Sequence, residues 1–245
     1  MKRLSILTAT LFTLFSACQA TPSLQESNKI TIPNDTKQIV KVTTPNWNSR
    51  NGTLQLYERN STKWHKVGEP ISIILGRNGL GWGLGLYTIP KDAKYIKKEG
   101  DGRSPAGLFK LGNGFGYKPL DIEYPYKIYT TTDHCVDDSN SIWYNKIINS
   151  KEIQKDYNSF EYMRRKDNLY QYGLVVEHNP NAIKYGGSCI FLHIRSGNGK
   201  GTAGCTAMSQ NNILKVLKWL KKEDKPLLLQ LPATETKKIA DNSLK

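Results

Sequence analysis

The clearest pattern along the chain is a series of short apolar runs separated by glycine, asparagine and proline. Apolar and polar side chains alternate in GTLQLYER (52–59), and a turn at NSTKW precedes a second run, WHKVGEPISIIL (64–75). Two further runs, QYGLVVEHN (171–179) and GSCIFLHI (187–194), have the composition of core strands, and PLLLQLP (226–232) that of a final strand. Alternation with a period of two is typical of β-strands. The pattern therefore predicts a mainly β protein.

One segment has the spacing of an α-helix instead. Ile213, Val216, Leu217 and Leu220 recur at intervals of three and four residues. Ser209 precedes them and can accept a hydrogen bond from the first turn, as N-cap residues do. We therefore expect one helix over residues 210–222. Residues 146–168 are mixed and charged, and they indicate either a short helix or a covering loop.

The N-terminus has the pattern of an export signal. Lys2 and Arg3 precede an apolar run of twelve residues, 4–15, which is too short to span a bilayer. The sequence FSAC then places small residues before Cys18, as in a bacterial lipoprotein signal, although Phe15 stands where leucine is usual. We expect cleavage before Cys18 and its lipidation. The alternative is ordinary cleavage after Ala20.

The remaining chain divides into three parts. Residues 18–45 are polar and are expected to be a tether, with one strand near 38–43. Residues 46–232 form the predicted compact domain, and residues 233–245 a polar tail.

Export changes how charge and cysteines are interpreted. The net charge of +14 is not accompanied by a nucleic-acid-binding motif, so no nucleic-acid partner is predicted. Outside the inner membrane the polyanions are wall peptides, wall polymers and lipid headgroups. Cysteines stand at 18, 135, 189 and 205, with spacings that fit no zinc motif, and no metal site is predicted. A disulfide between Cys135 and Cys189 is compatible with an oxidising compartment, but spacing does not establish it.

The glycine-dense stretch GRNGLGWGLGLY (76–87) is a further candidate for a binding motif. A dinucleotide-binding fingerprint requires a strand, a tight turn and then a helix, and no helical pattern follows here. We therefore predict no bound dinucleotide. A loop whose backbone approaches another strand or a ligand fits better.

Candidate chemistry is concentrated in FLHIRSGNGKGTAGCTAMS (191–209). His193 ends an apolar strand, and Cys205 follows twelve residues later, after a glycine-rich loop. An imidazole can take the proton of a thiol or pair with the thiolate and lower its pKa. Gly204 has no Cβ, so nearby N–H groups can approach an oxyanion, and one such donor contributes about 3 kcal/mol. Thr202 can orient the loop or a substrate. The alternative is that His193 and Cys205 only pack the core.

The pattern resembles the L,D-transpeptidase catalytic domain family (YkuD-like enzymes). Its members carry a histidine on a strand and then a Ser/Thr-x-Gly-Cys sequence, which Thr202, Gly204 and Cys205 match. The run GDGRSPAGLF (100–109) resembles the family's G-D-G-x-x-P-x-G-x-F segment, and CVDD (135–138) and YN (144–145) resemble a secreted subgroup. The similarity covers roughly residues 47–232.

The chain departs from the family where substrate carboxylates are held. Family members usually carry arginine two residues after the cysteine, where this chain has Ala207. Three other arginines are candidates to compensate: Arg77, Arg103 and Arg195. Among these, Arg195 is predicted to bind substrate, together with Thr202 and Trp82.

The resemblance implies a twisted β-sandwich or barrel and an acyl-transfer function. Cys205 would be the nucleophile, His193 the general base and acid, and amides near Gly204 the oxyanion hole. The implied partners are peptidoglycan stem peptides and an amine acceptor, such as a wall-linked protein, and no cofactor is implied. The implied location is the periplasm or cell envelope, with membrane contact only through an N-terminal lipid. Two alternatives stay open, a carboxypeptidase or amide hydrolase of the same fold and a non-catalytic wall-binding lipoprotein.

Overall fold

A computed structural model describes residues 29–197 and 199–244 of the chain. The predicted signal segment and the lipidation site at Cys18 lie outside the described residues. Within these residues, no helix combines the length and the apolar character that a membrane span requires.

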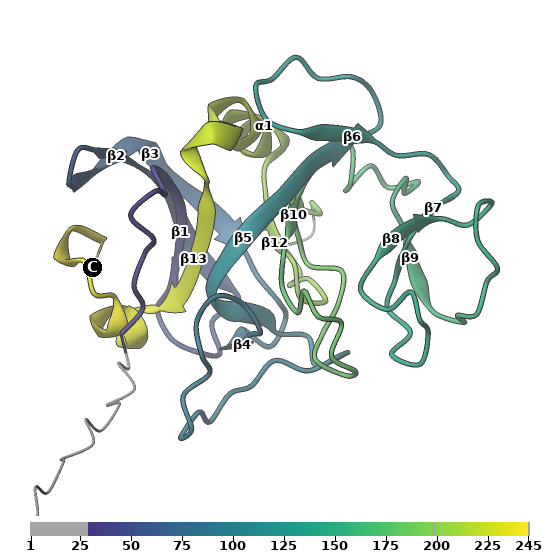
Figure 1. The fold of residues 1–245 in the computed structure, drawn as a ribbon, viewed down its shortest axis with the longest axis horizontal. Coiled ribbons are helices and arrows are strands. Elements are labelled where there is room, and N and C mark those ends of the chain that lie inside the picture. Colours follow the sequence, from purple (N-terminus) through teal and green to yellow (C-terminus); the bar gives the residue numbers. More distant parts are fainter. Residues whose placement is uncertain (1–28, 198, 245) are drawn as a thin grey trace, which may run out of the picture.

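Most of the strands form one ten-stranded sheet. Its strands are β1 (Gln38–Thr44), β2 (Asn51–Asn60), β3 (Lys63–Ile74), β4 (Leu80–Trp82), β5 (Ser104–Gly116), β6 (Tyr126–Ile128), β10 (Tyr172–Val176), β11 (Phe191–Ile194), β12 (Thr206–Met208) and β13 (Leu227–Pro232). The order is β10-β11-β12-β3-β2-β1-β13-β5-β4, with β6 also paired to β5. A further pairing of β10 with β5 joins the first strand of this path to its last but one. The main sheet is thus closed into a barrel, and the predicted mainly β fold is confirmed (Figure 1).

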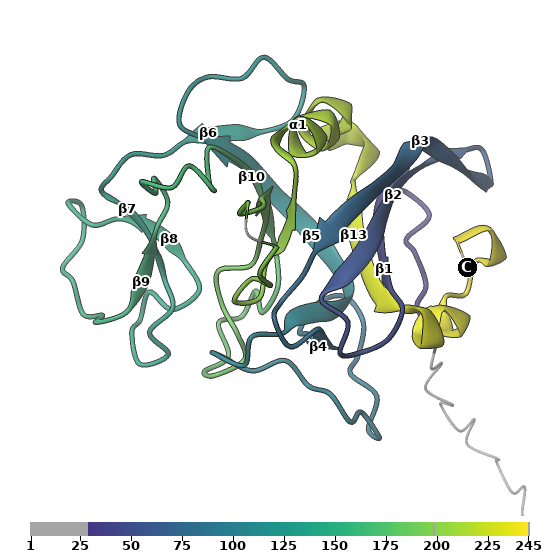
Figure 2. The ribbon, with the colours of Figure 1, turned by 180° about the vertical axis from the view of Figure 1, so that it is seen from behind.

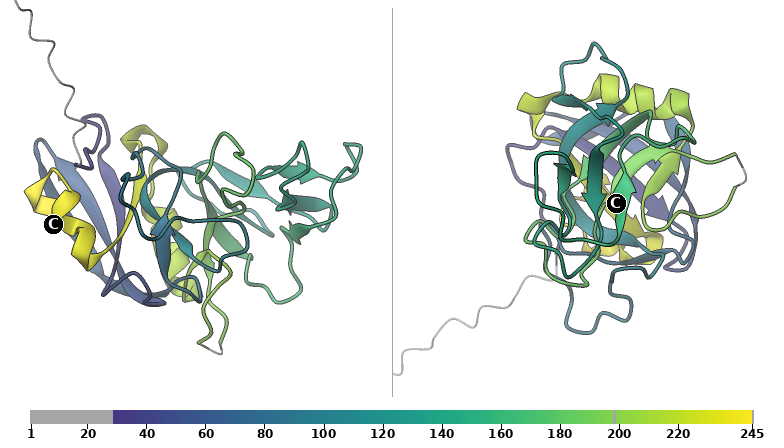
Figure 3. Two further views of the ribbon diagram at one scale, coloured as in Figure 1. Left: turned by 90° about the horizontal axis from the view of Figure 1, so that it is seen from below. Right: turned by 90° about the vertical axis from the view of Figure 1, so that its right-hand side faces the viewer.

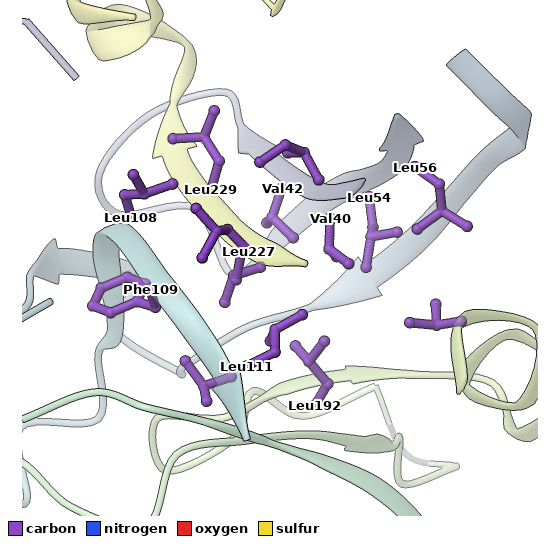
Figure 4. Packing of buried hydrophobic residues seen from close by; sticks show 14 of the residues in the cluster. Val40, Val42, Leu54, Leu56, Leu108, Phe109, Leu111, Leu192, Leu227 and Leu229 are labelled. Atoms are coloured by element: carbon purple, nitrogen blue, oxygen red, sulfur yellow. The ribbon is translucent and has the colours of Figure 1, made fainter. Parts of the chain in front are cut away.

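The centre of the barrel is held by strands that are buried on both faces. Every residue of β13 is buried, and so are the first five residues of β1, its parallel neighbour. Leucine and valine side chains from β1, β2, β5 and β13 meet in one cluster (Figure 4). Near-continuous apolar runs of this kind are expected where a strand has no solvent-facing side.

The predicted helix is present as α1 (Gln210–Trp219) and packs beside β10 and β11. It is shorter than expected because Leu220 adopts an extended backbone and becomes the C-cap. A short 3-10 turn, η1 (Lys222–Asp224), follows it. The Ser209 side chain caps the first turn, accepting the Asn212 N–H at 3.4 Å.

Removing this cap is expected to weaken the helix without affecting the barrel. Ser209→Ala leaves the Asn212 N–H without its side-chain acceptor and should lower the free energy of unfolding by about 1 kcal/mol. Urea unfolding of the variant measures the change, with Gln210→Ala at an exposed helix position as the control. An equal loss in both variants would contradict a capping role.

The tether and tail predictions need correction where the structure describes them. Residues 29–45 are not a free tether, because β1 lies inside the sheet and Ile30 forms a parallel bridge with Ile239. Both isoleucines are buried, and the Ile30 N–H donates to the Lys238 carbonyl at 2.6 Å. The tail forms the short helices η2 (Ala233–Lys238) and η3 (Asn242–Leu244) against this segment (Figure 2). The buried apolar residues of the tail are Ile239, which follows η2, and Leu244 of η3, so the tail is anchored although most of its residues are polar.

A second, three-stranded sheet lies beyond the barrel at the end opposite the chain's C-terminus (Figure 3). It consists of β7 (Asp133–Val136), β8 (Ile147–Asn149) and β9 (Phe160–Tyr162), with β7 in the middle. Residues 146–168, expected to be a short helix or loop, therefore contain two strands. A disulfide joins Cys135 of β7 to Cys189, just before β11. We call this part of the molecule, residues 130–170, the outer sheet unit.

Candidate active site

Cys205 lies directly before β12, which pairs in parallel with β11. Its thiol is 5% exposed and is the one free cysteine among the described residues. The Phe191 N–H donates to the sulfur at 3.3 Å, and the thiol donates to the Cys189 carbonyl at 3.5 Å. The sulfur is therefore held by two backbone groups, one at the first residue of β11 and one two residues before it.

His193 projects from the same face of these two strands. It is in register with Ala207 of β12, and Cys205 is two residues before Ala207. Side chains two apart on a strand share a face, so His193 and Cys205 are diagonal neighbours. The Nδ1 atom lies 2.8 Å from the Ile194 carbonyl oxygen. Since a carbonyl can only accept, Nδ1 carries the proton and Nε2 keeps a lone pair that can take another.

Both groups are neutral at rest. Burial lowers the pKa of His193 to about 4, although the Ile194 carbonyl opposes the shift. Burial, followed by the charge of Glu161, raises the pKa of the Cys205 thiol to about 12. Of the two roles considered for the imidazole, proton removal fits this resting state better than pairing with a thiolate, because desolvation disfavours the thiolate.

The loop before the cysteine is fixed by two hydroxyl groups. Thr202 Oγ1 donates to the Cys205 carbonyl at 2.6 Å and accepts the Gly204 N–H at 3.1 Å. Ser104 Oγ donates to the same carbonyl at 3.0 Å. A Cβ on Gly204 would lie 3.1 Å from the Arg103 carbonyl oxygen, so this close approach favours glycine. Because the Gly204 N–H is already bound, the N–H of Cys205 is the better candidate for an oxyanion donor.

Removing the Thr202 hydroxyl is expected to loosen this loop. Thr202→Val leaves the Gly204 N–H without its acceptor and should cost about 1–3 kcal/mol of stability, as unpaired polar groups do. Thr202→Ser keeps the hydroxyl and should restore most of it. Urea unfolding of the two variants checks this prediction. Equal losses for valine and serine would show that the methyl group, rather than the hydrogen bonds, matters.

A cavity of about 200 Å³ joins these groups. Its lining includes Cys205, His193, Thr202, Tyr170 and Ala207, together with the charged residues Glu161, Arg165, Arg195 and Lys200. The outer sheet unit therefore forms one wall and residues 200–205 the other. Ala207, which is paired with His193, contributes only a small side chain to this lining. The positive charges at the cavity come instead from Arg165, Arg195 and Lys200, which lie outside β12.

Two of the three residues predicted to bind substrate line this cavity, and the third does not. Thr202 and Arg195 line the cavity, as expected of binding residues. Trp82 does not line it, because its ring is 3% exposed and packs against Trp47 and Tyr87 in the barrel core. The prediction that Trp82 binds substrate is not supported by this position.

The two other arginines considered as replacements do not line the cavity either. Arg103 Nη1 donates to the Leu80 carbonyl at 2.7 Å, and its guanidinium stacks on Tyr95. Arg77 packs against Gly102 and Gly201. Both have structural roles in this arrangement.

Sequence reasoning missed Arg165, Tyr170 and Glu161, which all come from the outer sheet unit. Their stretch carries no motif, and only its suggested role as a covering segment pointed here. Ser104 was also missed, although it lies within the quoted GDGRSPAGLF motif.

Two other histidines and two acidic residues have structural partners. His178 contacts the Gly186 carbonyl through Nε2, and His134 Nδ1 contacts the Tyr157 hydroxyl. Asp133 and Asp138 accept backbone N–H groups of nearby turns. Within residues 29–197 and 199–244, no group of three or more His, Cys, Asp or Glu side chains is arranged to hold a metal ion.

Comparison with known proteins agrees with this geometry at the level of family. The model of the L,D-transpeptidase catalytic domain (YkuD) matches residues 46–229. Two solved structures of the helical cell shape determining protein Pgp2 from Campylobacter jejuni, one a point mutant, are similar at 15% identity. Their TM-scores are 0.42 and 0.40, and they cover 84% and 83% of this chain but 51% and 50% of their own. This chain thus spans about half the length of those structures. No curated protein matches the chain. From the matched domain we conclude that the chain belongs to the L,D-transpeptidase catalytic domain (YkuD) family.

Proposed function

We propose that this protein catalyses cysteine-dependent acyl transfer on peptidoglycan stem peptides, as an L,D-transpeptidase. One observation carries the proposal: Cys205 and His193 face one cavity from paired strands, and the Nε2 lone pair of His193 is available. Family membership supports the substrate class. The surroundings of Cys205 support its assignment as the nucleophile, because four hydrogen bonds hold its carbonyl and sulfur.

The first half-reaction forms a thioester. His193 Nε2 takes the thiol proton while the sulfur attacks the carbonyl that precedes the terminal D-amino acid. The carbonyl oxygen becomes an oxyanion beside the Cys205 N–H, where a preorganised donor stabilises it. As the tetrahedral intermediate collapses, the C–N bond breaks and His193 returns the proton to the leaving amine. The products are the free D-amino acid and a thioacyl-enzyme.

The second half-reaction resolves the thioester. When an amine from a second stem peptide or a wall-linked protein attacks, the product is a cross-link. When water attacks, the product is a shortened peptide. The cations Arg165, Arg195 and Lys200 around the cavity are suited to hold the carboxylates of the donor peptide in the absence of an arginine at position 207.

The proposed setting is the cell envelope. The N-terminal pattern supports export, and Cys18 is the candidate for a lipid anchor. The Cys135–Cys189 disulfide supports an oxidising compartment, because such bonds persist mainly outside the cytoplasm.

The test is mass spectrometry of purified tetrapeptide muropeptides incubated with the full chain, without reductant, beside Cys205→Ala. Cross-linked or exchanged products that vanish in the variant are expected. Shortened peptides alone would move the assignment to a hydrolase. Unchanged substrate with a folded protein that still binds cell walls would support a recognition module instead.

A further inference from the structure

The cavity contains one carboxylate among its lining residues, that of Glu161. This side chain comes from β9 in the outer sheet unit, and its Oε2 accepts a short hydrogen bond from the Tyr170 hydroxyl. The acyl-transfer scheme above uses neither residue. A half-buried carboxylate beside a nucleophile needs an explanation, because removing a charge from water is costly.

Tyr170 connects this carboxylate to the reacting sulfur. The tyrosine is 3% exposed, and its ring packs edge-on against His193 with centroids 5.2 Å apart. Its hydroxyl also lies near enough to the Cys205 thiol to lower the thiol pKa. The Arg165 guanidinium lies over the tyrosine ring, 5.1 Å from its centroid. Glu161, Tyr170 and Cys205 therefore form one continuous chain of polar groups.

Glu161 is also reached from a second cavity. A pocket of about 620 Å³ lies on the outer sheet unit and is lined by Phe160, Tyr162 and Arg164, among others. Of the residues that line the inner cavity, it shares Glu161 and Arg165, and it does not include His193 or Cys205. Glu161 therefore borders both the outer pocket and the cavity that contains the sulfur.

The charge of Glu161 acts in opposite directions in the two half-reactions. It disfavours the thiolate, and it therefore opposes the first half-reaction. Once the thioester has formed, the sulfur carries no charge and this opposition ends. The incoming amine or water must then lose a proton, and Glu161 is a carboxylate whose pKa is raised by burial, as a general base requires. His193 does not line the outer pocket, whereas Glu161 does, so Glu161 is the base that borders both cavities.

We propose that Glu161 is the general base of the second half-reaction, in which it takes a proton from the amine or water that enters from the outer pocket. This inference rests on the proposed acyl-transfer function. The new C–N or C–O bond forms, the C–S bond breaks, and Cys205 leaves as a thiolate. Glu161 then passes its proton to the Tyr170 oxygen while Tyr170 gives its own proton to the sulfur. Glu161 is again a carboxylate and Cys205 again a thiol, so the cycle closes.

The test follows the thioacyl-enzyme by intact-mass spectrometry of the full chain with tetrapeptide muropeptides. Glu161→Gln keeps an oxygen that can accept the Tyr170 hydrogen bond but cannot act as a base. We expect the thioacyl-enzyme to form at least as fast as in the wild type and to decay about 100-fold or more slowly, so that it accumulates. Glu152→Gln, an exposed position in the same unit, should behave as the wild type.

Chemical rescue separates a base from a structural residue. In Glu161→Ala, added formate should accelerate decay of the thioacyl-enzyme, because a small carboxylate can occupy the vacated space. Equal slowing of both half-reactions in Glu161→Gln, or decay at the wild-type rate, would overturn the proposed role of Glu161 and leave the acyl-transfer function standing. If the wild-type protein forms no thioacyl-enzyme and converts no muropeptide, the acyl-transfer function fails and this role fails with it.

Discussion

Replacement of His193 by alanine is expected to slow thioacyl-enzyme formation by about 10²- to 10⁴-fold, the usual contribution of a general base. The thiol pKa is raised to about 12 by burial, so very little thiolate exists at neutral pH without a proton acceptor. His193 Nε2 is the unprotonated ring atom beside it. Intact-mass kinetics with tetrapeptide muropeptides measures the rate, and His65→Ala at an exposed position of β3 is the matched control.

The pH dependence gives this prediction a second readout. Burial lowers the pKa of His193 to about 4, so the imidazole is a free base above that pH and is protonated below it. Thioacyl formation in the wild type should therefore fall on the acidic side near pH 4, well below the range of an ordinary histidine. His193→Ala should lack this limb while it remains folded. If the rate in the wild type instead falls near pH 6.5, His193 titrates as a solvated histidine does, and the pKa lowered by burial is contradicted.

The parts of the site that the sequence predicts are those encoded locally. Alternation of apolar residues identifies the strand that carries His193, and the Thr202–Gly204–Cys205 motif lies within four consecutive residues. The helix at 210–219 is likewise specified by its own spacing and by Ser209. Local patterns of this kind need no knowledge of distant partners.

The parts that it missed depend on contacts between distant segments. Glu161 and Tyr170 reach Cys205 only because β9 and the following loop fold over the barrel, and nothing in their own stretch encodes that contact. The sequence could not choose between proton removal and thiolate pairing at Cys205 for the same reason, since burial is a property of the surroundings. Ile30 appeared to belong to a tether because its partner, Ile239, lies at the other end of the chain.

Cys189 lies where the outer sheet unit meets the barrel. Its φ of 53° is left-handed and incompatible with the strand predicted to start at 187, so β11 begins only at Phe191. The Cys189 N–H donates to Asn145 Oδ1 at 3.0 Å, and its carbonyl accepts the Cys205 thiol. One residue therefore connects the disulfide, the outer sheet unit and the nucleophile.

Removal of this disulfide is expected to cost about 4 kcal/mol of stability. The bond between Cys135 and Cys189 closes a loop with a sequence separation of 54 residues. The chain-entropy relation gives about 4 kcal/mol for a loop of that length. Cys135→Ser/Cys189→Ser should show this loss in urea unfolding, whereas Cys205→Ser, which leaves the disulfide intact, should lose much less.

The same double variant should also lose activity under conditions in which it is still folded. The outer sheet unit supplies Glu161, Tyr170 and Arg165 to the cavity, and the disulfide is its one covalent cross-link to the start of β11 among the described residues. Thioacyl formation and decay should therefore both slow, in contrast to the one-sided effect of Glu161→Gln. Full activity with a stability loss below about 1 kcal/mol would show that packing alone, through Met163, Tyr170 and Phe191, holds the two units together.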